Sequence, residues 1–192
     1  MRLILMLMIA YFTGSINFAI ILLGLLGQED PRMKFSGNAG TTNVYRQAGI
    51  VWAAVVLLLD AGRAVGLAAL ALYLLPASQV AWVGMALVTG NRFPCFHRFQ
   101  GGKGVASFLG FTILLAPWGA VLSCLVWVAV YGIARIPFVA SFCMVFVLGG
   151  SAVLAGGAEV ISIAGTVATV LLIFLNHRKN IVVLLAERQG KR

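Results

Sequence analysis

The fold depends on how one apolar stretch is divided, residues 105–133, which read VASFLGFTILLAPWGAVLSCLVWVAVYGI. An α-helix needs about 20 residues to cross the roughly 30 Å of membrane hydrocarbon, so this stretch is too long for one span and too short for two full ones. Pro117 lies near its middle, and a proline inside a helix either kinks it or ends it. The stretch is therefore either one long kinked helix or two short helices that turn at residues 116–118.

The rest of the chain has the composition of an integral membrane protein. Of its 192 residues, 61% are hydrophobic and 10% are charged, and the mean hydropathy is +1.02. Globular proteins contain about 25% charged residues. Apolar segments also cover residues 3–26, 50–75, 80–96, 137–154 and 160–175. A signal peptide could explain only the first of them, so we expect an all-α integral membrane protein with a single membrane-embedded domain over residues 1–192.

The basic residues decide how residues 105–133 are divided. If the chain turns at Pro117 there are seven spans, and the connections that contain lysine or arginine are those after spans one, three, five and seven. These residues are Arg32, Lys34 and Arg46; Arg92, Arg98 and Lys103; Arg135; and Arg178, Lys179, Arg188, Lys191 and Arg192. Because cytoplasmic loops carry an excess of cations, we predict seven transmembrane helices, with the N-terminus outside and the C-terminus in the cytoplasm. Spans four and five are then short, which requires local thinning of the bilayer or burial within the bundle.

Two charged residues lie inside the second apolar segment. Asp60 and Arg63 are three residues apart, which places them on one face of a helix. Charges at that depth are costly unless they are paired or functional. We therefore predict an internal ion pair.

A polar, glycine-rich island, GNRFPCFHRFQGGKGVAS, occupies residues 90–107. Gly101, Gly102 and Gly104 surround Lys103, so the backbone can present several N–H groups and a cation to an oxygen-rich anion, and phosphate is the first candidate. The alternative is an interfacial loop whose cations contact lipid headgroups. The island is not a Walker A loop, because His97 stands where the first glycine belongs and Gly104 follows the lysine.

Three further polar segments fall on the same side of the membrane in the seven-span topology. The first contains Ser36, Gly37, Asn38, Thr42, Asn43 and Arg46, the second contains Ser141 near Arg135, and the third opens the C-terminal tail with His177 and Asn180. Hydroxyls, amides and arginine can hold a phosphate or a polyol, although a tight turn followed by a capped helix would explain part of the first segment. Segments gathered at one membrane face indicate one site.

Several other functions are not supported by the sequence. Cys95, Cys124 and Cys143 are an odd number without CxxC spacing, His97 and His177 are far apart, and only five acidic residues are present, so we expect neither a metal nor a cofactor. The net charge of +9 is explained by the topological bias, and we expect no nucleic-acid partner. A membrane transporter for an organic phosphate is the main alternative, but the predicted outward loops contain no cation and the chain has no internal repeat.

The polar segments resemble the motifs of the bacterial membrane glycerol-3-phosphate acyltransferases that use acyl phosphate as donor, the PlsY family. Residues 36–46 reproduce a first motif, Ser-Gly-Asn-x-Gly-x-Thr-Asn-Val-x-Arg. Residues 93–106 are similar to a second, and residues 177–181, His-Arg-x-Asn-Ile, to a third. The chain departs from the family pattern at Phe35, Asn91, Gln100 and Val183, where the family usually has Gly, His, Lys and Arg.

This resemblance implies transfer of an acyl group from acyl phosphate to the sn-1 hydroxyl of glycerol 3-phosphate, at the cytoplasmic face of the bacterial inner membrane. His177, Asn180 and Lys103 are then the expected catalytic residues. The expected substrate-binding residues are Ser36, Gly37, Asn38, Thr42, Asn43, Arg46, Gly101, Gly102, Gly104 and Ser141. The expected partners are the two substrates, the bilayer and the enzyme that makes the acyl phosphate. No activated nucleophile is visible, so we expect direct attack, with either His177 or a phosphate oxygen of the donor taking the proton.

Overall fold

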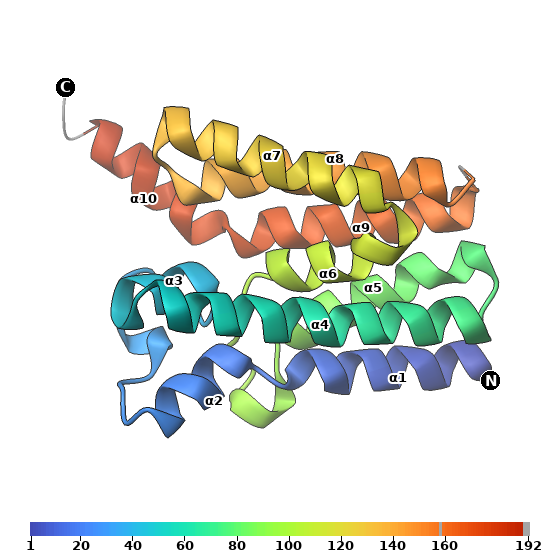
Figure 1. Cartoon of the computed structure of the whole chain (residues 1–192), viewed down its shortest axis with the longest axis horizontal. Coiled ribbons are helices and arrows are strands. Elements are labelled where there is room, and N and C mark those ends of the chain that lie inside the picture. Colours follow the sequence, from blue (N-terminus) through green and yellow to red (C-terminus); the bar gives the residue numbers. More distant parts are fainter. Residues whose placement is uncertain (158, 190–192) are drawn as a thin grey trace.

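The computed structural model describes residues 1–157 and 159–189, and the regular structure in these ranges is helical, as predicted (Figure 1). The helices are α1 (Arg2–Ser15), α2 (Phe18–Leu25), α3 (Thr41–Ala48), α4 (Ile50–Leu74), α5 (Ala77–Arg92), α6 (Val105–Leu115), α7 (Pro117–Ala134), α8 (Pro137–Ala155), α9 (Val160–Asn176) and α10 (Arg178–Gln189). Two 3-10 turns, η1 (Pro31–Met33) and η2 (Cys95–His97), lie in the connections. Lys191 and Arg192 of the predicted basic tail lie outside the described residues.

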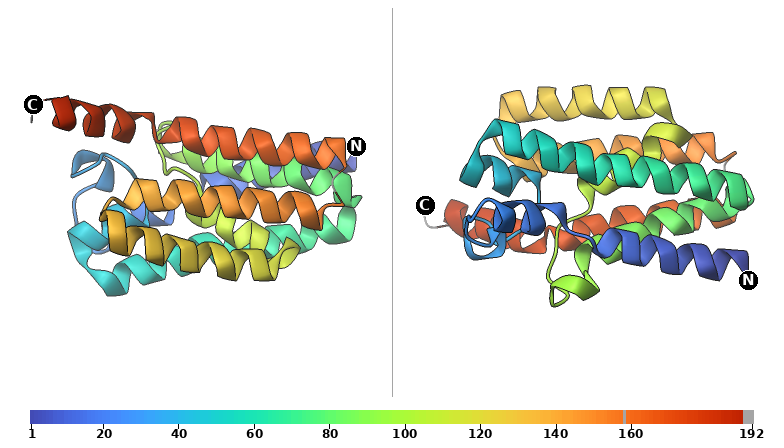
Figure 2. Two further views of the ribbon diagram at one scale, coloured as in Figure 1. Left: turned by 90° about the horizontal axis from the view of Figure 1, so that it is seen from above. Right: turned by 60° about the horizontal axis from the view of Figure 1, so that its bottom comes forward.

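The long helices run along one common axis and form a bundle (Figures 1 and 2). The most extensive contacts are between α1 and α5, α7 and α8, α4 and α6, and α5 and α9. Apolar side chains such as Met6, Leu67 and Leu87 fill the space between α1, α4 and α5. The short helices α2, α3 and α10 lie at the end of the bundle opposite the N-terminus. The polar segments next to them are therefore brought to one end of the molecule.

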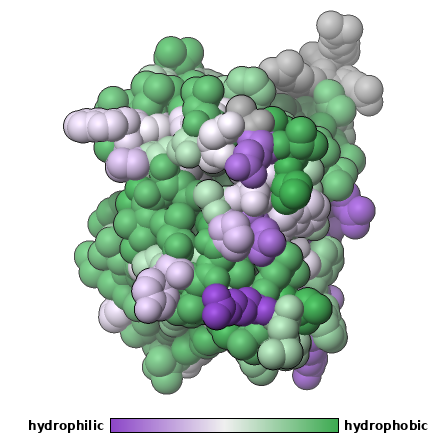
Figure 3. Space-filling view, turned by 90° about the vertical axis from the view of Figure 1, so that its right-hand side faces the viewer, coloured by the Kyte–Doolittle hydropathy of each residue, from purple (hydrophilic) through white to green (hydrophobic). Residues whose placement is uncertain are grey.

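The outer surface of the bundle is apolar. Trp118 and Ile133 on α7 are 84% and 88% exposed, which is the pattern of a helix that faces lipid. The end that holds the N-terminus is also covered mostly by hydrophobic side chains (Figure 3). Among the described residues, four helical segments are long and apolar enough to cross a membrane, and a fifth is formed if α9 and α10 are joined across their 43° bend.

The chain turns at Ala116, as the alternative with two short helices predicts. Helix α6 ends at Leu115, and Pro117 is the first residue of α7, where its missing N–H has no intrahelical partner to lose. With 11 residues, α6 is shorter than the about 20 residues that a span of about 30 Å needs, as expected for the fourth segment. It is packed among neighbouring helices, with Phe108 and Phe111 buried.

The span predicted over residues 3–26 is present as the segment Arg2–Leu25, which is long and apolar enough to cross a membrane, but it is not one continuous helix, because the backbone breaks at Ile16 and Asn17. The side chain of Asn17 accepts a hydrogen bond from the N–H of Ile20 at 3.1 Å and so caps α2. It also donates to the carbonyl of Ala39, at 3.1 Å. At the break between the two helices, the buried Asn17 thus contacts the loop that carries the first motif.

Candidate functional site

The connection between α5 and α6 projects from the side of the bundle beside the break between α1 and α2 (Figure 2). It starts at Phe93, whose carbonyl accepts a hydrogen bond from the Tyr11 hydroxyl at 2.8 Å. It returns to the bundle at Gly101, whose N–H donates to the carbonyl of Arg92, and at Gly102, whose N–H donates to the carbonyl of Asn91, at 3.2 and 2.9 Å. The glycine-rich segment is therefore held against the last turn of α5.

These hydrogen bonds correct one expectation. The amides of Gly101 and Gly102 were predicted to be free for an anion, but backbone carbonyls already accept them. Glycine is required here for close packing, because a Cβ atom at Gly101 would lie 2.1 Å from the Asn91 carbonyl oxygen, and one at Gly102 would lie 2.8 Å from that of Ala39. Among the three predicted glycines, Gly104 alone has a left-handed φ, +91°.

The free N–H groups that could bind an anion lie instead at the start of α6. The first hydrogen bond of this helix runs from the N–H of Phe108 to the carbonyl of Gly104. The N–H groups of Val105, Ala106 and Ser107 therefore precede the intrahelical ladder and carry the partial positive charge of a helix N-terminus. Lys103 lies directly before them in the chain.

Lys103 brings the second and third motifs together. Its Nζ donates to Oδ1 of Asn180 at 2.6 Å, and its carbonyl accepts a hydrogen bond from Nδ2 of Asn176 at 3.2 Å. Burial, followed by the positive charges of Arg46 and Arg92, lowers the pKa of Lys103 to about 8. The ammonium group is thus a cation at neutral pH that lies among other cations, as expected of a site for a multiply charged anion.

His177 lies in the break between α9 and α10 and is only 2% exposed. Its Nδ1 is 2.8 Å from the carbonyl oxygen of Ile173, so Nδ1 carries a proton and Nε2 of the neutral ring has the lone pair. The ring of Phe142 packs edge-on against it, with centroids 5.1 Å apart. Burial, followed by the charge of Lys103, lowers the pKa of His177 to about 4. The imidazole is therefore neutral at physiological pH.

The first motif forms the loop before α3 and the start of that helix. Asn43 is 1% exposed, and its Nδ2 donates to the carbonyls of Pro31 and Lys34, at 2.6 and 3.0 Å. Its side chain therefore shapes the loop, and its Oδ1 is 3.4 Å from the Ser36 hydroxyl. Gly37 has a φ of +64° in the turn that follows. Ser36, Thr42 and Arg46 are exposed, while Asn38 is half-buried.

Ser141 lies on α8, next to the Phe142 that contacts His177. Its hydroxyl donates to the carbonyl of Pro137 at 3.0 Å and accepts from Nε1 of Trp127 at 3.3 Å. Both hydrogen bonds stay within the α7–α8 pair, so this serine is not joined to Lys103 by a direct contact.

The predicted ion pair between Asp60 and Arg63 is confirmed, at 2.8 Å, but Arg63 does more than neutralise a charge. Its Nη2 also donates to Asn91 Oδ1 at 3.0 Å and to the Ser107 hydroxyl at 3.3 Å. Its Nη1 donates to the carbonyls of Thr13, Gly14 and Ile16 at the helix break, and the Thr13 carbonyl also accepts the N–H of Ile16 at 3.3 Å. The sequence does not predict this role, since Gly14, Ser15 and Asn17 at the break are equally compatible with a continuous helix that packs closely against its neighbours.

Comparison with known proteins gives one answer over the whole chain. The family model described as glycerol-3-phosphate acyltransferase matches residues 4–187. The glycerol-3-phosphate acyltransferase of Myxococcus xanthus is 38% identical over 96% of this chain and 96% of its own length. That of Bordetella pertussis is 36% identical over 97% of this chain and 90% of its own.

Solved structures agree with these relatives. The crystal structure of PlsY (YgiH), an integral membrane glycerol 3-phosphate acyltransferase, in its glycerol 3-phosphate form has a TM-score of 0.89 and 31% identity, covering 98% of this chain and 94% of that one. Its lysophosphatidic acid form has a TM-score of 0.87 and 30% identity, with the same coverage. The chain therefore belongs to the membrane glycerol-3-phosphate acyltransferase family that includes PlsY.

Proposed function

We propose that this chain transfers an acyl group from an acyl phosphate to the sn-1 hydroxyl of glycerol 3-phosphate. The products are 1-acylglycerol 3-phosphate, which is lysophosphatidic acid, and inorganic phosphate. The contact between Lys103 and Asn180 carries the proposal, because it joins two motifs at a cluster of cations and both substrates are phosphates. The glycerol 3-phosphate and lysophosphatidic acid forms of PlsY are consistent with the acceptor and product of this reaction.

The proposed chemistry is a direct displacement at the acyl carbonyl carbon. The sn-1 oxygen forms a bond to this carbon, the bond from the carbon to the phosphate oxygen breaks, and phosphate leaves with the electron pair. Negative charge accumulates on the carbonyl oxygen and on the leaving phosphate. Lys103, Arg46 and the start of α6 would neutralise these charges in a site held ready before the substrates bind. The exposed hydroxyls of the first motif, Ser36 and Thr42, would hold the two phosphates together with these groups.

Two groups can accept the proton of the attacking hydroxyl. One is Nε2 of His177, which carries the lone pair in the neutral ring. The other is a phosphate oxygen of the donor itself. Asn180, held by Lys103 at 2.6 Å, would orient the hydroxyl through its side-chain amide. Neither route requires an acylated residue.

The location of the reaction is part of the proposal. We place seven passes in the bacterial inner membrane, with the N-terminus outside and the site facing the cytoplasm, within one domain over residues 1–192. The gathering of α2, α3 and α10 at the end opposite the N-terminus supports an odd number of passes. The acyl chain of the donor then stays in the bilayer while its phosphate reaches Lys103, and the enzyme that makes the acyl phosphate delivers it from the same side.

The test is product formation by the purified protein in lipid. Acyl phosphate and labelled glycerol 3-phosphate should give labelled 1-acylglycerol 3-phosphate and phosphate in equal amounts, and Lys103→Ala should remove most of this activity while the protein stays folded. Acyl thioesters serve as the comparison donors. Product from a thioester but none from acyl phosphate would contradict the proposed donor. Uptake of labelled glycerol 3-phosphate into vesicles without acylation would favour a transporter.

A further inference from the structure

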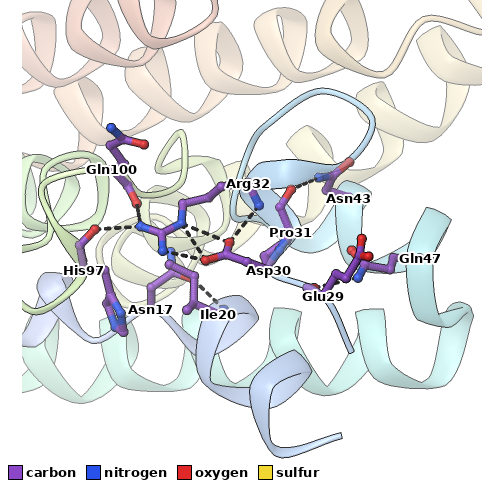
Figure 4. A network of polar contacts seen from close by, with 10 residues as sticks. All are labelled: Asn17, Ile20, Glu29, Asp30, Pro31, Arg32, Asn43, Gln47, His97 and Gln100. Atoms are coloured by element: carbon purple, nitrogen blue, oxygen red, sulfur yellow. Dashed lines mark hydrogen bonds and ion pairs between the residues drawn. The ribbon is translucent and has the colours of Figure 1, made fainter. Parts of the chain in front are cut away.

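Arg32 joins the loop of the first motif to the tip of the glycine-rich connection (Figure 4). Its Nη1 donates to the carbonyl of His97 at 2.7 Å and to that of Gln100 at 3.2 Å. Its Nε and Nη2 face the carboxylate of Asp30, at distances of 2.5 to 3.0 Å. The guanidinium group of Arg32 is thus oriented by Asp30 on its own loop. It also donates hydrogen bonds to two backbone carbonyls that lie more than 60 residues away in sequence.

The two carbonyls that Arg32 grips flank a strained turn. Arg98 and Phe99 lie between them, and both have a φ of +56°, a left-handed conformation that residues other than glycine rarely adopt. Two such residues in succession persist where surrounding contacts hold them. The phenyl ring of Phe99 is exposed and supplies little packing. Backbone hydrogen bonds close the turn, from the N–H of Gln100 to the carbonyl of His97 and from the N–H of Phe99 to the carbonyl of Pro94, at 3.3 and 3.0 Å. The hydrogen bonds from Arg32 add a side-chain contact that ties this turn to the loop of the first motif.

The turn leads directly into the site. Gln100, which accepts from Arg32, is followed by Gly101 and Gly102, which bond to the end of α5, and then by Lys103. At Gly102 the two loops touch again, because a Cβ atom there would lie 2.8 Å from the carbonyl oxygen of Ala39. The loop of the first motif therefore meets the glycine-rich connection at its tip and at its base.

We propose that Arg32 is a positioning residue for acyl transfer, and this inference rests on the proposed function. By holding the turn at residues 97–100, it fixes the path along which the chain returns to α5 and so sets where Lys103 stands relative to Asn180. Asp30 acts on Arg32, since it orients the guanidinium plane. Lysine cannot replace the arginine fully, because a single ammonium lacks the planar fork that meets a carboxylate and two carbonyls together.

The chain offers a matched control. Lys34 lies two residues further along the same loop, and its ammonium pairs with Glu29 at 3.0 Å on an exposed part of the surface. Lys34→Ala removes the same charge from the same loop without touching the connection at residues 97–100. If Arg32→Ala and Lys34→Ala differ in activity, the loss of the hydrogen bonds to residues 97 and 100 explains the difference. The change in net charge does not, because it is the same in both variants.

The experiment compares wild type, Arg32→Ala, Arg32→Lys, Asp30→Asn and Lys34→Ala in lipid nanodiscs. Two quantities are measured: steady-state acyl transfer from acyl phosphate, and hydrogen exchange of the amides of Gly101 and Gly102. We expect Arg32→Ala to lower kcat by about tenfold or more and to speed exchange at both glycines, because loss of preorganisation slows the chemical step. Asp30→Asn should give a smaller effect in the same direction, and Lys34→Ala should stay within about twofold of wild type, as expected for an exposed pair.

The remaining outcomes are decisive. The proposal is overturned if Arg32→Ala keeps the wild-type hydrogen exchange at Gly101 and Gly102 together with a kcat within about twofold of wild type. It is also overturned if exchange at these glycines becomes faster while kcat is unchanged. If Arg32→Ala does not fold, Arg32→Lys takes its place, with the same two criteria. A wild-type protein that folds but transfers no acyl group would overturn the proposed function, and the exchange comparison would then decide by itself whether Arg32 holds the turn.

Discussion

The side chain of Lys103 combines burial with a cationic neighbourhood. Its ammonium is held at 2.6 Å by Asn180, and Arg46 and Arg92 lie near enough to disfavour its charge. Burial and the neighbouring cations both disfavour the charged form of Lys103. A dianionic phosphate would offset both effects, because it supplies opposite charge and hydrogen-bond acceptors in a desolvated place. The residue is thus set up to gain more from its ligand than an exposed lysine would.

We expect kcat/KM to fall as the pH rises through about 8. The pKa of Lys103 is lowered to about 8, so the charged form is present below that pH and is lost above it. A profile of kcat/KM from about pH 6 to about pH 10 reports the ionisations of the free enzyme. In Lys103→Arg, whose guanidinium stays charged throughout, any remaining activity should show no such fall. A wild-type profile that stays flat across this range would contradict the assignment.

At this scale the sequence identified the motif residues but not the contacts that organise them. Lys103, His177 and Asn180 are predicted site residues because their types and spacing match known motifs. The contact of Arg32 with His97 and that of Arg63 with Asn91 could not be predicted, since these partners lie 65 and 28 residues away and are chosen by packing. The amides of Gly101 and Gly102 were misassigned for the same reason: their carbonyl partners in α5 become neighbours only in the folded chain.

Among the elements, the close contact between the glycine-rich connection and the first-motif loop gives a second prediction. Gly102→Ala should lower turnover by up to about 100-fold, because its Cβ would push against the Ala39 carbonyl and displace Lys103 by a fraction of an ångström or more. Gly132→Ala on α7 is the control, since a Cβ there meets no atom within 4 Å. That variant should keep full activity and gain up to about 1 kcal/mol of stability from its better helix propensity. Equal activity of the two variants would show that the loops do not need this contact.

Arg63 gives the third prediction, which concerns stability. Arg63→Ala leaves the buried Asp60 unpaired and the carbonyls at the α1–α2 break without their donor. We expect a loss of about 3–5 kcal/mol in the free energy of unfolding, the usual result of removing one partner of a buried pair. Denaturant unfolding in lipid micelles measures it. The double variant Asp60→Asn, Arg63→Ala should lose less free energy of unfolding than Arg63→Ala alone, because it leaves no buried charge unpaired. An equal or larger loss would mean that the contacts of Arg63 with the carbonyls contribute more than the ion pair.

The helices themselves were predicted unevenly. The division of residues 105–133 at Ala116 followed from Pro117 and from the distribution of basic residues, and the structure confirms it. The break at Ile16 and Asn17 was missed because the flanking residues are apolar enough to read as one span. Asn17 caps α2 locally, but its bond to the Ala39 carbonyl and the bonds from Arg63 on another helix depend on residues that become neighbours only in the folded chain.

For the whole molecule, the topology yields a fourth prediction. In a variant without Cys95, Cys124 and Cys143, single cysteines at the exposed Ala77 and Ala155 should react with an impermeant thiol reagent added outside intact cells, and one at the exposed Gln28 should not. The expected orientation follows from the cations gathered at the end that holds α3 and α10. Labelling of Gln28 with protection of Ala77 and Ala155 would reverse the orientation and place the site on the outer face.

The most direct measurement is a matrix of initial rates in which acyl phosphate and glycerol 3-phosphate are both varied. Direct transfer requires both substrates to be bound before phosphate leaves, so the double-reciprocal lines should intersect, and the wild-type protein should release one phosphate for each 1-acylglycerol 3-phosphate formed. Parallel lines would indicate an acylated enzyme and contradict direct transfer. Absence of product at every combination of substrate concentrations would contradict the acyl-phosphate reaction itself.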